Sequence, residues 1–112
     1  MKKLMAANWK MYKTGAEAVA TLNELAGLLN GQAPEGREIV IFVPFTALEK
    51  ASDAMKAIKG GMTGAENMYP AAEGAFTGEI SARRCYSWHR SKPRRCCRRR
   101  ELRMDGYVCR LC

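Results

Sequence analysis

The chain has 112 residues, of which 47% are apolar, a length and composition that fit one small globular domain or part of a larger one. The net charge of +8 averages two different parts: residues 1–81 hold eight Lys or Arg and nine Asp or Glu, whereas residues 82–112 hold eleven and two. The absence of a long apolar run near the start argues against a signal peptide or a membrane span and predicts a cytoplasmic location.

The first predicted element is a short apolar strand over residues 3–7, which we expect to be buried on both faces. Thr14 and Glu17 have the spacing of a capping box, in which the side chain of each residue bonds the main chain of the other. Apolar residues at steps of three and four predict a helix behind this box, and Asn30-Gly31 ends it. The apolar stripe of this helix consists of Val19, Leu22, Leu25, Ala26 and Leu29.

The second predicted strand covers residues 38–43 and is the most pronounced strand signal in the chain. It is β-branched and continuously apolar, so both of its faces should be covered. Pro44 ends it, and Thr46 with Glu49 predicts a second capping box. The helix that follows should bury a stripe made of Leu48, Ala51, Met55 and Ile58.

A glycine pair at positions 60 and 61 should end this helix before a weak third strand over residues 62–66. A loop rich in Gly, Ala and Pro then covers residues 67–78. Its two aromatic residues, Tyr69 and Phe76, are expected to be anchors, by packing within the loop or at an interface, rather than to take part in chemistry.

The order of strand, helix, strand, helix, strand predicts right-handed crossovers and a parallel sheet. Functional residues of such sheets lie at the carboxyl ends of the strands. Asn8 and Lys10 follow the first strand and Asn67 follows the third, so we expect these three residues on one rim. On position alone, Lys10 could equally be an ordinary surface lysine, and Trp9 is expected to pack.

Three stretches of the sequence resemble the N-terminal third of the triosephosphate isomerase family: AANWKMYK at 6–13, VPFTAL at 43–48 and GAENMYPAAEGAFTGEIS at 64–81. The resemblance implies a (β/α)8 TIM barrel that interconverts dihydroxyacetone phosphate and glyceraldehyde 3-phosphate in glycolysis and gluconeogenesis, without a cofactor. The expected fold class is therefore α/β: a TIM-barrel fragment of about three parallel strands with two covering helices, followed by a basic irregular tail.

The same resemblance implies roles for individual residues. Asn8 and Lys10 would bind the triose phosphate, with the Lys10 ammonium beside the phosphate and the developing enediolate, where a fixed charge favours the transition state. The loop over about 67–79 would cross the interface of a homodimer. Thr77 would touch the partner's Asn8, and Asn67 and Glu79 lie on the same loop.

The match ends after Ser81. By the family's usual spacing its electrophilic histidine falls at Cys97, and the single histidine, His89, has no matching context. Residues 81–86 can be encoded so that another reading frame gives Ser-Pro-Ala-Met-Leu, the family's continuation. We therefore interpret the chain as two parts, residues 1–81 from a barrel and residues 82–112 as a disordered tail from a frameshifted or truncated gene. Negligible isomerase activity, marginal stability and loss of the family's homodimer are expected.

The tail has two other interpretations. The basic run at residues 94–100 is typical of segments that bind nucleic acid phosphates. Four side chains with Cys or His ligand chemistry, Cys85, His89, Cys109 and Cys112, could hold zinc. The run is not set in a nucleic-acid-binding fold, and the second Cys pair of a strong zinc motif is missing. The sequence thus favours a protein without metal, nucleic acid or membrane partners.

Overall fold

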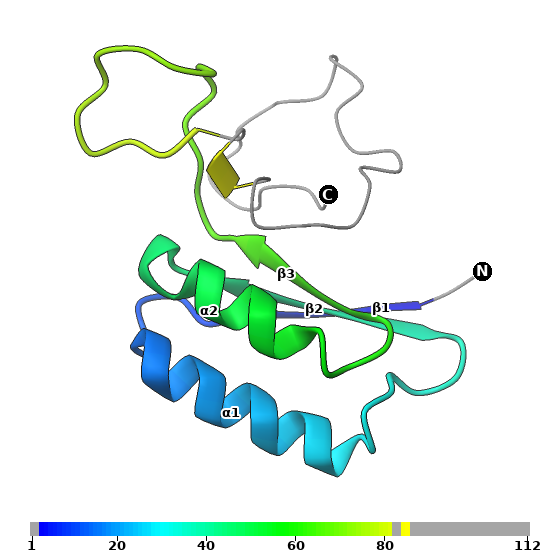
Figure 1. Cartoon of the computed structure of the whole chain (residues 1–112). Helices are drawn as coiled ribbons and strands as arrows, with labels where there is room; N and C mark the ends of the chain where they lie inside the picture. The colour runs from blue at the N-terminus through cyan, green and yellow to red at the C-terminus, as the bar shows by residue number, and fades with distance from the viewer. Residues whose placement is uncertain (1–2, 82–83, 86–112) are drawn as a thin grey trace.

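The computed structural model describes residues 3–81 and 84–85 and contains five elements in the predicted order. These are β1 (Lys3–Asn8), α1 (Gly15–Leu28), β2 (Arg37–Val43), α2 (Phe45–Met55) and β3 (Gly61–Ala65). The three strands form one parallel sheet in the order β1-β2-β3, and both helices cover the same face of it (Figure 1). The expected three-stranded part of an α/β barrel is confirmed.

The hydrophobic core lies between β2, β3 and the two helices. Because side chains alternate between the faces of a strand, Ile39, Ile41 and Val43 point toward the helices, where they join the core cluster. Val40 and Phe42 are also buried, on the opposite face. The prediction that both faces of the second strand are covered is therefore confirmed.

The apolar stripes predicted for the two helices are buried to different extents. The stripe of α2 and the turn after it is almost completely buried, with Leu48, Ala51, Met55 and Ile58 at most 2% exposed. On α1, Leu22 is fully buried, and the other stripe residues are half-buried. The helix ends where it was predicted to end, because Asn30 and Gly31 adopt left-handed backbone conformations, with φ of 50° and 71°.

Two predictions about these elements are wrong. All six residues of β1 are exposed rather than buried, because neither helix packs substantially on β1 and none of its residues joins the core cluster. Thr46 does not cap the second helix. That helix begins at Phe45, directly after the strand ends, so its N-cap is Pro44, which offers no side-chain hydrogen bond.

The predicted tail, with its candidate nucleic-acid and zinc roles, lies outside the described residues except for residues 84–85. Within the ranges 3–81 and 84–85, no helix has the length and apolar character needed to cross a membrane.

Candidate functional site at the carboxyl ends of the strands

The carboxyl ends of the three strands meet at one rim, as the predicted topology requires. Asn8 is the last residue of β1 and lies directly beside Phe42 of β2, which in turn lies beside Gly64 of β3. The chain leaves this rim through Lys10 on one side and through Glu66 on the other. The rim therefore brings together polar side chains from opposite edges of the sheet.

A hydrogen bond fixes the relation between Asn8 and Lys10. The Lys10 N–H donates to Oδ1 of Asn8 over 2.7 Å, and Lys10 adopts a left-handed backbone conformation with φ of 56°. This conformation is unfavourable for a lysine, and the short amide side chain two residues earlier offsets part of the cost. The Trp9 N–H donates to the Phe42 carbonyl over 3.0 Å and continues the β1–β2 ladder to this point. The main chain at Lys10 is thus held by the sheet.

The segment from Trp9 to Thr14 is also held at its far end. Lys13 lies over the Trp9 ring, with its Nζ 5.6 Å from the ring centroid. The capping box predicted at Thr14 and Glu17 is present: the Thr14 N–H donates to Oε2 of Glu17 over 2.7 Å, and the Thr14 hydroxyl accepts from the Glu17 N–H. Lys10 therefore lies on a short segment that is anchored on both sides.

Glu66 is a site residue that sequence reasoning missed. It follows β3 directly, and its N–H donates to the Val43 carbonyl over 3.2 Å. Desolvation raises the pKa of its carboxyl group above the ordinary value of 4.5, while the Lys10 N–H and the Lys10 charge act in the opposite direction. Its Oε1 atom is buried and has no hydrogen-bond partner among the described residues. The rule that placed Asn67 on the rim could have identified its neighbour Glu66.

After β3 the chain forms a wide loop beyond the rim and then returns close to the start of the loop (Figure 1). The Tyr69 N–H donates to the Ile80 carbonyl over 2.8 Å, and Tyr69 forms an isolated parallel bridge with Ser81. The rings of Tyr69 and Phe76 lie 4.5 Å apart and are tilted by 40°. The prediction that these two aromatic residues anchor the loop by packing is confirmed.

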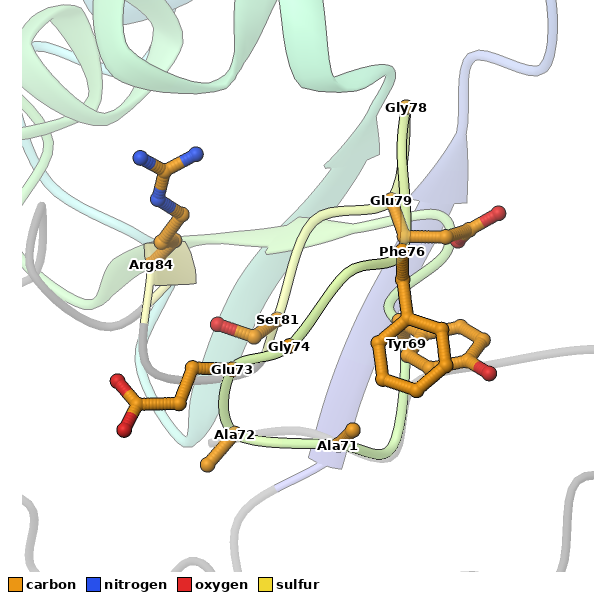
Figure 2. A pocket seen from close by; sticks show the side chains of 10 residues that line it. All are labelled: Tyr69, Ala71, Ala72, Glu73, Gly74, Phe76, Gly78, Glu79, Ser81 and Arg84. Carbon is orange, nitrogen blue, oxygen red and sulfur yellow. The ribbon is translucent and has the colours of Figure 1, made fainter.

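The loop lines a pocket that is open to solvent. Figure 2 shows Tyr69 and Phe76 on one side of this pocket and Arg84 on the other. The other lining residues are Ala71, Ala72, Glu73, Gly74, Gly78, Glu79 and Ser81. Asn67, Thr77 and Glu79 are all exposed on this loop. The contact predicted between Thr77 and a partner's Asn8 stays a prediction.

Of the four residues considered for zinc, only Cys85 is described. It is 8% exposed and belongs to the core cluster, and burial raises the pKa of its thiol, which opposes formation of the thiolate that binds metals. In the described part of the chain, no group of three or more His, Cys, Asp or Glu side chains is placed to hold a metal ion. This environment is that of a packing residue.

A parallel α/β sheet with polar side chains at its carboxyl rim is the arrangement of barrel enzymes. Residues 3–89 match the family model for triosephosphate isomerase, and the chain belongs to the triosephosphate isomerase family.

Several similar proteins bear that name. The triosephosphate isomerase of Nitratidesulfovibrio vulgaris (strain Miyazaki F) is 57% identical over 81 residues, which are 72% of this chain and 32% of the relative. Those of Oleidesulfovibrio alaskensis and Dictyoglomus thermophilum are 53% and 51% identical, over 72% and 71% of this chain and 32% and 31% of the relatives. The chain thus spans about a third of the length of the curated relatives that it matches.

Proposed function

We propose that the chain supplies the first part of a triose phosphate binding site, with Asn8 and Lys10 as its substrate-binding residues. The observation that supports this proposal most directly is the 2.7 Å hydrogen bond from the Lys10 N–H to Asn8 at the carboxyl rim of a parallel sheet. An ammonium on an anchored main chain needs little reorganisation to stabilise the phosphate and the negative charge that develops on the enediolate.

We further propose that this chain, as it stands, has no significant isomerase turnover and acts in the cytoplasm. Proton transfer between two carbons needs a general base and an electrophile, and each such group contributes about 10²–10⁴-fold. By the family's usual spacing the position of its electrophilic histidine falls at Cys97, so this chain lacks that group. Turnover by the full chain purified from a host without its own triosephosphate isomerase, at a rate near that of a relative, would contradict this proposal.

The loop over residues 67–79 is proposed to be the arm with which a complete barrel contacts its partner in a homodimer. Exposed apolar side chains near the rim support such a contact: Met11 is 97% exposed, Tyr12 74% and Phe76 45%. Met11 and Tyr12 are adjacent in the chain, and neighbouring hydrophobic side chains this exposed are typical of surfaces that another protein covers. Within this proposal, Thr77 and Glu79 face the second subunit.

A chimera tests the substrate-binding role. Residues 1–81 replace the corresponding part of the triosephosphate isomerase of Nitratidesulfovibrio vulgaris, whose remaining two thirds complete the barrel. We expect isomerase activity close to that of the parent. In the chimera, Lys10→Gln should lower kcat/KM by at least about 10²-fold, because the charge is lost where the reaction develops negative charge.

Lys13→Gln is the matched control for this experiment, since Lys13 lies three residues away and packs over Trp9. It should leave kcat/KM within about threefold of the parent chimera, as surface substitutions usually have small effects. Equal losses for the two lysines, or an active chimera that tolerates Lys10→Gln, would contradict the proposed role.

A further inference from the structure

One aromatic side chain lies in the same row of the sheet as Asn8. Asn8, Phe42 and Gly64 pair in register across the three strands, and we call them the end row. Residues that pair in register point to the same face of a sheet, and side chains alternate along each strand. Because Ile41 and Val43 belong to the core cluster beneath the helices, the end row lies on the other face. In a barrel that face is the interior, and the active site lies at its carboxyl end.

The Phe42 ring packs directly on the main chain of Gly64. A Cβ atom added to Gly64 would lie 2.5 Å from Cε1 and 2.6 Å from Cδ1 of Phe42, far inside van der Waals contact. Glycine in a strand often marks such a close approach. The ring therefore leans toward β3 and away from β1, which carries Asn8. The contact is made between two neighbouring strands, so it needs no strand beyond β3.

We propose that the Phe42 ring forms the apolar floor of the triose phosphate site and that Gly64 positions this ring. The inference rests on the proposed function of Asn8 and Lys10 and adds two residues to their site. An apolar floor excludes water, and the interaction of an ammonium with a developing negative charge is stronger where water is excluded. With the ring held over β3, the space in front of Asn8 is left to the substrate.

The position of the ring depends on Gly64 because of the order of residues in the end row. A methyl group at position 64 would force the rigid ring off its rotamer. Asn8 is the neighbour of Phe42 on the other side of the row. The displaced ring would move toward the amide that accepts the hydrogen bond from the Lys10 N–H. A methyl group at position 64 should thus narrow the space for the substrate without removing any group that contacts it.

The chimera that tests the proposed function also tests this inference, with glyceraldehyde 3-phosphate as the substrate. Gly64→Ala should raise KM at least about tenfold with little change in kcat, because the displaced ring occupies space that the substrate needs. Phe42→Ala should lower kcat at least about tenfold, because water then reaches the Lys10 ammonium. If KM of the Gly64→Ala chimera stays within about threefold of the parent, the proposal is overturned.

The double variant, Phe42→Ala with Gly64→Ala, shows whether position 64 acts through the ring. The Phe42→Ala chimera has no ring to displace, so adding Gly64→Ala to it should change KM less than about twofold. An equal rise in KM with and without the ring would show that position 64 acts independently of Phe42, and it would contradict the proposal.

Gly61→Ala is the matched control, because it adds the same methyl group at the other end of β3. Its Cβ atom would lie 2.6 Å from Sδ of Met55 in α2, so the substitution crowds the strand on the helix side. It should lower the thermal unfolding midpoint but leave KM and kcat within about twofold of the parent chimera. Equal kinetic effects for Gly61→Ala and Gly64→Ala would show that crowding of β3, rather than the ring, alters the site.

Two further outcomes separate this inference from folding and from the proposed function. If Gly64→Ala prevents folding, Phe42→Ala decides alone, and a kcat within about threefold of the parent overturns the proposal. Lys10→Gln in the same chimera reports on the proposed function itself. If the chimera tolerates Lys10→Gln, neither proposal holds. If Lys10→Gln lowers kcat/KM while Gly64→Ala and Phe42→Ala change neither constant, only the role of Phe42 is wrong.

Discussion

β1 and β2 are neighbours in the same parallel sheet and are both rich in apolar residues, but their burial differs. Five consecutive residues of β2, Ile39 to Val43, are at most 8% exposed, whereas every residue of β1 is exposed. α2 packs on β2 and β3, and the core cluster contains Ile39, Ile41 and Val43 of β2 but no residue of β1. Burial of an apolar strand is therefore decided by what packs against it rather than by its own composition.

The helices show the same contrast. α2 packs on β2 and β3, whereas α1 packs mainly against α2 and only marginally against the strands. A buried hydrogen bond of 2.6 Å between the hydroxyl groups of Ser52 and Thr63 joins α2 to β3. We call β2, α2 and β3 the central unit, and we expect it to carry most of the stability of the chain.

The most direct test compares two residues that lie side by side. Ile39 in β2 pairs in register with Met5 in β1, and their exposed fractions are 8% and 46%. Ile39→Ala should lower the free energy of unfolding by about 2–4 kcal/mol, because it leaves a cavity in the core. Met5→Ala should cost under about 1 kcal/mol.

Urea unfolding followed by circular dichroism measures both variants. A chain of this size has little stability in reserve. Ile39→Ala is therefore expected to abolish the cooperative transition or to shift it strongly. Equal losses for the two variants would contradict the idea that the central unit carries the stability.

The hydroxyl pair tests the joint between α2 and β3. Ser52→Ala should cost about 1–2 kcal/mol, because it leaves the buried Thr63 hydroxyl without its partner. Adding Thr63→Val to Ser52→Ala should recover most of that loss, since both polar groups are then gone. The measurement is a double-mutant cycle of unfolding free energies, and additive losses would show that the two hydroxyls act independently.

The N-termini of α1 and α2 should show a smaller difference in their contribution to stability. Thr14→Ala should cost about 1 kcal/mol, because Thr14 caps α1. Thr46→Ala is the matched control, because Thr46 is exposed in the first turn of α2 and the N-cap of that helix is Pro44. This substitution should lower the free energy of unfolding by less than about 0.5 kcal/mol.

The capping box also has a pH dependence. Hydrogen bonds from Thr14 lower the pKa of Glu17 below its ordinary value of 4.5. The stability that this carboxylate contributes is present above pH 4.5 and is lost as the pH falls through the lowered pKa of the folded state. Glu17→Gln, which removes the titrating carboxyl group, should remove this dependence, and unfolding curves at several acidic pH values would detect the change.

Glu66 links β1 to the central unit, since it follows β3 and interacts with Lys10, which follows β1. Its substitution should have the smallest effect on stability. Desolvation raises its pKa, so the folded state holds the proton more tightly than the unfolded chain does. The contribution of Glu66 to stability is therefore most favourable below pH 4.5 and is lost as the pH rises through the folded pKa.

Glu66→Gln should thus raise the unfolding midpoint slightly at neutral pH and flatten the pH dependence above pH 4.5. Glu24→Gln, at an exposed position of α1, is the control and should leave the unfolding midpoint unchanged. A lower midpoint for Glu66→Gln at neutral pH would show that the ionised carboxylate stabilises the rim.

The sequence predicted the elements and part of the site correctly. The five elements were found within one or two residues at most ends, and so was the Thr14–Glu17 capping box. The placement of Asn8 and Lys10 on one rim followed from topology alone, because parallel strands end at a common edge. Glu66 was missed because the third strand was predicted to run through residue 66, whereas β3 ends at Ala65 and Glu66 follows it. Its burial and its nearness to Lys10 became known only from the structure.

The sequence by itself determined what depends on near neighbours along the chain: helical periodicity, the Thr14 cap, the end of α1 before Asn30 and the family to which the chain belongs. Only the tertiary structure decided that β1 is exposed while β2 is buried, and that Glu66 lies beside Lys10. Burial and electrostatic environment depend on residues that are distant along the chain, and local patterns contain no information about which of those residues come together.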